Sequence, residues 1–279
     1  MPELPEVETV KKTLQQLVIG KKIADVTVLW PRIVKRPDDV EEFRICLSGQ
    51  TIHDVGRRGK FLKFILDDDV LVSHLRMEGR YTLSEHGEPS DKHTHVIFTF
   101  TDKTELRYRD VRKFGTMHVF AKGEEESHLP LAQLGPEPLD RTFTAAFLTG
   151  KFAKTTRNVK AVLLDQTAVA GLGNIYVDES LFRAGIHPER RADQLEQEEI
   201  RRLHRAIRQT IREAVAQGGS TVRSYVNGQG EMGMFQQSLF VYARRGEACK
   251  KCGTELEKSI VAGRGTHFCP KCQKPGVIT

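Results

Sequence analysis

Met1-Pro2-Glu3-Leu4-Pro5-Glu6-Val7-Glu8 opens the chain, and the pattern that follows it predicts the element on which the rest is arranged. Between Pro5 and Leu17, apolar residues recur at every third or fourth position, and Gly20 ends the pattern. That spacing predicts an amphipathic helix whose apolar face packs on a core. Pro2 would then be attached to a rigid body.

The first residues also have the groups for amine chemistry. If Met1 is removed, Pro2 becomes a secondary amine, and an α-amino group titrates near ~7.7–8.0. Its neutral form can attack an aldehyde-type carbon, giving a charged iminium that acts as an electron sink for elimination. Glu3 is placed by connectivity to transfer protons at the same point. The alternative is that Pro2 and Glu3 only start a helix, since proline and glutamate both favour a first turn.

Composition favours a polyanionic partner. The 279 residues have 39% hydrophobic content, a net charge of +6 and a pI near 9.0. Eight Lys and Arg against three Glu between Arg244 and Thr279 place most of the basic excess in the tail, as in nucleic-acid-binding proteins. A basic surface that only solubilises the protein is the alternative. We find no signal peptide and no apolar run long enough for a membrane span.

Periodicity divides the chain into a β-rich part and a helical part. Between Ile23 and Phe120, short segments including Phe43–Val55 read as strands, with turns at Asp67–Asp69 and Thr101–Lys103, which indicates a β-sandwich. Proline and acidic residues between 121 and 141 read as a linker. Helical patterns follow, the longest at Leu195–Gln217, and Gly218–Gly233 reads as a mobile glycine-rich loop.

Two Cys-x-x-Cys pairs predict a metal site. Cys249 and Cys252 are separated by sixteen residues from Cys269 and Cys272. Four thiolates complete a tetrahedral zinc site with no open position, so we expect one structural Zn²⁺. A redox pair is the alternative. Arg264 lies between the pairs, next to glycines that suit a hairpin tip.

Several basic and apolar residues can be interpreted either as DNA contacts or as ordinary structural residues. Arg112 and Phe114, with Met77, are side chains of the kind that fill the gap left by a flipped base. Phe114 and Met77 are otherwise core residues. Lys60 begins a strand and could meet a phosphate or donate a proton, and His93 is a candidate phosphate contact. Asn174, after Gly171-Leu172-Gly173, reads as a helix N-cap at an end that can hold a phosphate.

Taken together, these motifs resemble the bacterial formamidopyrimidine-DNA glycosylases, with related features in the endonuclease VIII branch. The resemblance spans nearly the full length. It rests on Pro2–Glu8, Arg58-Gly59-Lys60, His74-Leu75-Arg76-Met77, Arg112-Lys113-Phe114-Gly115, Leu134–Leu139, Gly171–Tyr176 and the four cysteines. Ala243 stands where glycine is usual, and Arg76 and Glu78 flank Met77 where some relatives have smaller residues.

The resemblance implies an α+β fold, with DNA bound between its domains. We expect an N-terminal catalytic β-sandwich with a flanking helix (1–121), a linker (122–141) and a helix-two-turn-helix domain (142–217). A glycine-rich lesion loop and connection (218–243) and a zinc β-hairpin finger (244–279) complete the chain.

The resemblance also implies a mechanism. Pro2 would attack the sugar C1′ of an oxidised purine nucleotide such as 8-oxoguanine or a formamidopyrimidine, forming a Schiff base, with Glu3 supplying a proton. Lys60 matches a lysine linked to the first elimination and Arg264 the finger arginine linked to the second. Met77, Arg112 and Phe114 match the residues that fill the stack. Phosphate contacts would come from Asn174, Arg157 and His93.

Two other functions remain open at this point. One is an endonuclease VIII-type glycosylase acting on oxidised pyrimidines. The other is a zinc-finger DNA-binding protein without catalysis, which would make no use of Pro2 or Glu3. In the leading interpretation the partner is double-stranded DNA with an oxidised base, and the protein is a monomer in the bacterial cytoplasm.

Overall fold

The computed structural model describes residues 1–220 and 233–275. These form two compact units: residues 1–132 with 218–220 and Gly233, and residues 133–217 with 234–275. The first unit is built mainly from strands and the second mainly from helices, so the expected α+β class is confirmed. No helix in the described part of the chain has the length and apolar composition needed to cross a membrane.

The first unit contains an antiparallel four-stranded sheet in the order β1-β7-β8-β6. Lys103 donates its backbone N–H to Phe100 at 3.1 Å, which closes the expected turn between β7 and β8. The strands of this sheet are β1 (Ile23–Val28), β6 (Arg80–Glu85), β7 (Thr94–Phe100) and β8 (Thr104–Arg109).

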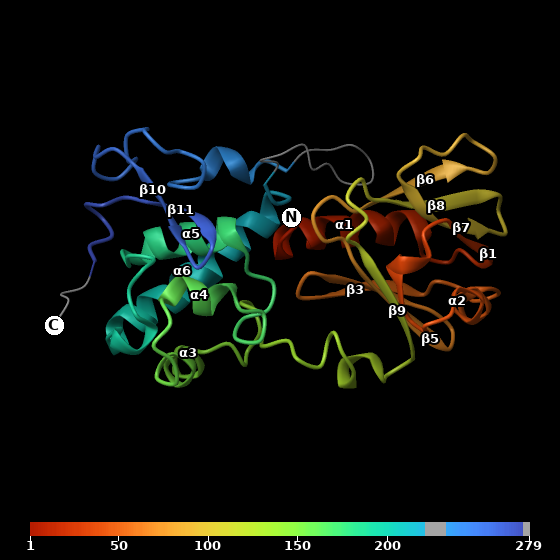
Figure 1. The fold of residues 1–279 in the computed structure, drawn as a ribbon, viewed down its shortest axis with the longest axis horizontal. Helices are drawn as coiled ribbons and strands as arrows, with labels where there is room; N and C mark the ends of the chain where they lie inside the picture. The colour runs from red at the N-terminus through yellow and green to blue at the C-terminus, as the bar shows by residue number, and fades with distance from the viewer. Residues whose placement is uncertain (221–232, 276–279) are drawn as a thin grey trace. The chain divides into compact units, whose positions relative to one another are not determined.

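A second sheet in the same unit has five strands in the order β2-β9-β5-β4-β3. Figure 1 labels three of them, β3, β5 and β9. Only the β2–β9 pair is parallel. Its strands are β2 (Val34–Arg36), β3 (Asp54–Arg58), β4 (Phe61–Ile65), β5 (Asp69–His74) and β9 (Thr116–Ala121). The turn at Asp67–Asp69 joins β4 to β5 as expected.

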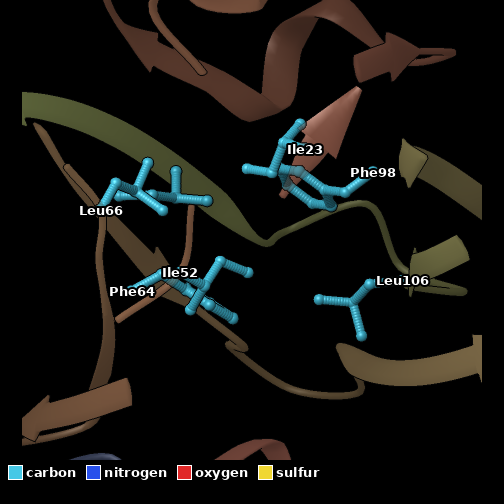
Figure 2. Close-up of a pocket in the computed structure, with 7 residues that line it drawn as sticks. Ile23, Ile52, Phe64, Leu66, Phe98 and Leu106 are labelled. Carbon is cyan, nitrogen blue, oxygen red and sulfur yellow. The ribbon is translucent and has the colours of Figure 1, made fainter. Parts of the chain in front are cut away.

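Apolar side chains from both sheets form the core of the first unit. Phe98 and Leu106 come from the four-stranded sheet, Phe64 and Leu71 from the five-stranded one, and all four are at most 2% exposed. Figure 2 shows part of this core, where seven apolar residues line a small cavity. The cavity volume is about 10 Å³ and no polar group lines it, so it is packing space and not a ligand site.

Two helices complete this unit. Helix α1 (Leu4–Val18) buries Val7, Val10 and Leu14 and packs on β3 and β4. The expected strand at Phe43–Val55 is wrong in its first half, because α2 (Val40–Leu47) occupies it. Asp39 caps α2 by accepting the Glu42 N–H at 2.8 Å, and Phe43 and Leu47, four residues apart, form its buried face.

The second unit contains the helices and the finger. Helix α6 confirms the long amphipathic helix expected at Leu195–Gln217. The elements are α3 (Ala145–Phe152), α4 (Val159–Leu164), α5 (Asn174–Ala184), α6 (Gln197–Ala216) and the antiparallel hairpin β10 (Glu257–Val261) and β11 (Arg264–Phe268). Short 3₁₀ helices in the two units are η1 (Pro31–Ile33), η2 (Glu125–Ser127), η3 (Ala192–Gln194) and η4 (Phe235–Ser238).

Candidate active site and nucleic-acid interface

The N-terminal residues are buried at the start of α1. Pro2 is buried and Glu3, the N-cap residue, is 4% exposed, while Met1 is 48% exposed. Glu3 donates its backbone N–H to Glu6 Oε2 at 2.8 Å, which fixes the first turn of the helix. Pro2 is therefore the residue directly before a helix start whose first turn is fixed.

Glu6 also holds the beginning of the glycine-rich segment. Its Oε1 accepts the Ser220 N–H at 2.7 Å and faces Gly219, where an added Cβ would lie 2.7 Å from the same oxygen. Gly219 has a φ of +80°, so both its backbone and its neighbours require glycine. The expected glycine-rich lesion loop thus begins at the first turn of α1. Its residues 221–232 lie outside the described part of the chain.

Lys60 lies at the same end of the first unit as Pro2. Helix α1 runs antiparallel to β3, because Gln15 bonds to Asp54 at 2.9 Å and Glu8 bonds to Arg57 at 2.8 Å. Arg57 also donates to the Gly59 carbonyl at 3.0 Å, which ties the Gly59–Lys60 turn to the start of α1. Lys60 is only 5% exposed. The buried Lys60 and the buried Glu3 therefore lie at the same end of the first unit.

Met77 sits in a tight turn after β5 that is fixed by His74. His74 Nδ1 accepts the Arg76 N–H at 2.8 Å, and Arg76 has a left-handed φ of 53°. Burial, with the nearby cations Arg76 and Lys60, lowers the pKa of His74 to about 3. The ring is therefore neutral at neutral pH, with its proton on Nε2. Met77 itself is half-buried.

Arg112 and Phe114 lie in the loop between β8 and β9. Phe114 is 50% exposed, and the Arg112 guanidinium carbon lies 4.7 Å from its ring centroid. The alternative that Phe114 is a core residue is therefore wrong. His93 is half-buried, and its backbone carbonyl accepts the Asp110 N–H at 3.0 Å, which places it at the base of this loop.

In the second unit the structure brings Asn174 and the finger arginine together. Asn174 Nδ2 donates to the carbonyl of Gly265 at 2.8 Å, the residue after Arg264. Asn174 is the first residue of α5 and Gly173 is its N-cap, so the expected cap at Asn174 is wrong. Arg264 begins β11 and is exposed, which confirms the expected place of this arginine at the hairpin end.

Arg157 has partners of its own. Its guanidinium bonds to Asp165 and to the Ala161 carbonyl, both at 3.0 Å, although the side chain is 53% exposed. A phosphate would have to share or replace these bonds.

The four finger cysteines fit a zinc ion. Their sulfur atoms all lie within 4.8 Å of one another. Tetrahedral zinc with bonds of ~2.3 Å separates its sulfurs by roughly 3.8 Å, so the set closes on the ion with little movement. Cys249 and Cys269 are buried and pack with Phe182, Val241 and Leu256. A bound zinc ion would thus supply stability that this small module, with few core residues, cannot obtain from packing alone.

Sequence reasoning missed several residues that position this machinery. Glu6 fixes the start of α1, Asp110 and Tyr108 lie under the loop between β8 and β9, and Lys160 forms a buried ion pair with Asp178 at 2.6 Å. The signal for Glu6 was present, because a glutamate three residues after Glu3 is a helix-start pattern. The partners of Asp110 and Lys160 depend on tertiary contacts that no periodicity indicates.

Three family models match successive parts of the chain. The formamidopyrimidine-DNA glycosylase N-terminal domain matches residues 1–117, and the H2TH domain of the same glycosylase matches residues 134–226. A zinc finger found in FPG and IleRS matches residues 246–275.

Full-length relatives and solved structures agree with these matches. The chain is 64% identical to a formamidopyrimidine-DNA glycosylase of Bacillus licheniformis over 274 residues, covering 98% of this chain and 100% of the relative. It is 62% identical to that of Bacillus subtilis over 273 residues, covering 98% and 99%. A crystal structure of a Lactococcus lactis FPG mutant with Fapy-dG containing DNA superposes with a TM-score of 0.92 at 44% identity, covering 98% and 100%. MutM with carbocyclic 8-oxo-G containing DNA gives 0.91 at 43%, also covering 98% and 100%.

Proposed function

Because the chain belongs to the formamidopyrimidine-DNA glycosylase family, whose members are DNA glycosylases of base excision repair, we propose that it removes oxidised purines and then cuts the strand as a lyase. The substrates of this proposal are 8-oxoguanine and formamidopyrimidines in double-stranded DNA. The protein acts as a monomer in the bacterial cytoplasm. The observation that carries the proposal is the pair of buried residues Pro2 and Glu3 at a rigid helix start, with Lys60 at the same end of the unit.

The first step uses the Pro2 nitrogen after Met1 has been removed. The amine forms a bond to C1′ while the bond between C1′ and the base breaks, and the base leaves with the electron pair and takes up a proton. The Pro2 nitrogen gives up the proton that it carried as an amine, and Glu3 supplies a proton at the sugar ring oxygen. The bond between C1′ and the ring oxygen then breaks, which leaves the opened sugar as an iminium on Pro2. Burial of Glu3 beside Pro2 supports this assignment.

Two eliminations follow from the iminium. Loss of a C2′ proton expels the 3′ phosphate, and a second elimination expels the 5′ phosphate, leaving a one-nucleotide gap. Water then releases the sugar fragment from Pro2. Lys60 serves the first elimination and Arg264 the second, each by binding a phosphate beside the lesion.

DNA binding uses groups in both units. Met77, Arg112 and Phe114 fill the stack that the flipped nucleotide leaves, and Arg112 bonds the orphaned cytosine. Asn174, Arg157 and His93 contact phosphates. The zinc ion supplies no chemistry to the reaction, because four thiolates leave it no open position. It holds the hairpin that presents Arg264.

Paired oligonucleotides test the substrate class. Under single-turnover conditions we expect faster excision from a duplex with 8-oxoguanine opposite cytosine than from a matched duplex with an oxidised thymine. The reverse order would support an endonuclease VIII-type activity. Binding without excision on either duplex would support a DNA-binding protein without catalysis. Mass spectrometry of the active protein should show that Met1 is absent, since Pro2 cannot be an amine while Met1 is attached.

A further inference from the structure

The loop between β8 and β9 is organised by one buried carboxylate. Asp110 is 0% exposed. Its Oδ1 accepts the Arg112 N–H at 3.0 Å, and its Oδ2 accepts the N–H groups of Phe114 and Gly115 at 2.8 and 2.9 Å. The Asp110 carbonyl lies 2.7 Å from Nε2 of the buried His95. The Asp110 carboxylate therefore fixes the backbone of the loop by accepting three N–H groups. The contact between its carbonyl and His95, a residue of β7, holds Asp110 against the sheet.

Tyr108 connects this loop to the turn that holds Met77. A Cβ on Gly115 would lie 1.8 Å from the Tyr108 hydroxyl, and a Cβ on Gly79 would lie 2.2 Å from the same atom. Gly79 closes the Met77 turn by donating its N–H to the Leu75 carbonyl at 2.9 Å. Tyr108 is 0% exposed. The two segments that carry Met77, Arg112 and Phe114 thus rest on one buried hydroxyl, and only glycine allows the contact.

A third contact is made outside the core. Lys113 has a left-handed φ of 58°, and its ammonium lies 4.0 Å from the ring centroid of Trp30, the single tryptophan of the chain. Trp30 is itself attached to the sheet, because its backbone N–H donates to the His95 carbonyl at 3.3 Å. A cation held over an indole face is attracted by the ring. Lys113 therefore braces the loop against the strand that precedes Trp30.

We propose that the Met77 turn and the Arg112–Phe114 loop form one preassembled wedge, with Asp110, Tyr108 and the Lys113–Trp30 pair as its positioning residues. The wedge presents Arg112 and the half-exposed Phe114 in a fixed arrangement before DNA binds. Because the two segments are already ordered in the free protein, they lose less conformational entropy on insertion into the duplex than flexible segments would. This inference rests on the proposed function for its role in catalysis, but the preassembly itself does not.

The preassembly is tested on the free protein. In Asp110→Asn, hydrogen exchange at the amides of Arg112, Phe114 and Gly115 should accelerate by roughly tenfold or more, because the charged acceptor is lost. In Lys113→Gly, the emission of Trp30 should change in intensity. Lys103→Gly is the matched control, since Lys103 is also exposed with a left-handed φ of 67° but lies over no ring of the described residues. Unchanged exchange in Asp110→Asn, or equal emission in the two lysine variants, would overturn the wedge.

The role in base extrusion is tested by varying the cost of flipping. A lesion without an opposite base is cheaper to extrude than a paired one. Asp110→Asn and Lys113→Gly should therefore slow excision of 8-oxoguanine opposite cytosine by about tenfold more than excision opposite an abasic site. Lys113→Gly changes only an exposed residue and remains informative if Asp110→Asn fails to fold. Equal slowing of both substrates would contradict the role in extrusion. If the wild-type protein excises neither lesion, the proposed function fails, and the exchange and emission results still decide whether the wedge exists.

Discussion

Replacing Lys160 by methionine should destabilise the second unit strongly. The ammonium of Lys160 in α4 lies 2.6 Å from Oδ1 of Asp178 in α5 and 2.8 Å from the Thr266 hydroxyl in β11. Both charged side chains are 0% exposed. Lys160→Met keeps most of the volume but removes the cation beside the buried Asp178 carboxylate. The backbone N–H of His267 donates to Asp178 Oδ2 at 2.9 Å, but it carries no charge that could replace the ammonium. The His267 ring Nδ1 lies farther from the same oxygen, at 3.6 Å.

The magnitude follows from this burial. Removing one partner of a buried ion pair costs about 3–5 kcal/mol, because the remaining charge is uncompensated. A domain is typically stable by only ~5–15 kcal/mol, so much of the stability would be lost. Removing both charges in Lys160→Met/Asp178→Asn should restore most of it, since replacing the whole pair is often close to neutral.

Urea denaturation followed by far-ultraviolet circular dichroism measures these changes. The matched control is Lys63→Met, which removes a more exposed lysine paired with Glu125 and Glu126 at 2.9 and 2.7 Å. That variant should lose less stability than Lys160→Met, because the Lys63 side chain is 15% exposed and Glu126 is 46% exposed. The reasoning is refuted if Lys160→Met loses no more stability than Lys63→Met, or if the double variant is as unstable as the single one.

Three further predictions concern other parts of the chain. Burial and neighbouring cations lower the pKa values of His74 and His118 to about 3 and about 4. Both values lie below the ordinary histidine pKa near 6.5, so the unfolded chain takes up protons before the folded protein does. The stability that the two neutral histidines contribute is therefore complete above about pH 6.5 and is lost as the pH falls toward 4 and 3. A free energy of unfolding that stays constant from pH 7 to 4 would contradict this prediction. Cys269→Ser should lower the zinc content and weaken DNA binding, measured by metal analysis and a binding titration, whereas Cys46→Ser, away from the cluster, should change neither. Gly115→Ala should cost about 1–3 kcal/mol through its clash with Tyr108. A Cβ added at Gly150 in α3 would have no neighbour within 4 Å, so Gly150→Ala should stabilise the protein by ~0.5–1 kcal/mol. Melting temperatures that shift in the same direction in Gly115→Ala and Gly150→Ala would contradict these two expectations.

Local patterns predicted the elements whose partners are near in sequence or whose chemistry is self-contained. The apolar repeat of α6 marks a helix wherever it packs, and two Cys-x-x-Cys pairs bring the same four thiolates together in any hairpin. The strand expected from Phe43 failed because Phe43 and Leu47 also suit a helix face, and the Asp39 cap decides between them. Asn174 suited an N-cap, but Gly173 takes that position and Asn174 binds the finger instead.

The positioning residues could not be predicted from pattern alone. Lys160 and Thr266 are 106 residues apart, and nothing in either segment identifies the other as its partner. The contact of Tyr108 with both Gly79 and Gly115 depends on the packing of β8 beneath two separate turns. Sequence motifs therefore identified the groups proposed to meet DNA, while the buried groups that hold them required the fold.

Borohydride trapping on duplex DNA with one 8-oxoguanine opposite cytosine tests the central claim most directly. The account predicts a covalent adduct with the native protein that maps to the N-terminal peptide at Pro2. The adduct should be lost or strongly reduced in Pro2→Gly and Glu3→Gln, with DNA binding retained. An adduct that maps to a lysine, or no adduct from a protein that binds the same duplex, would contradict the assignment of Pro2 as the nucleophile.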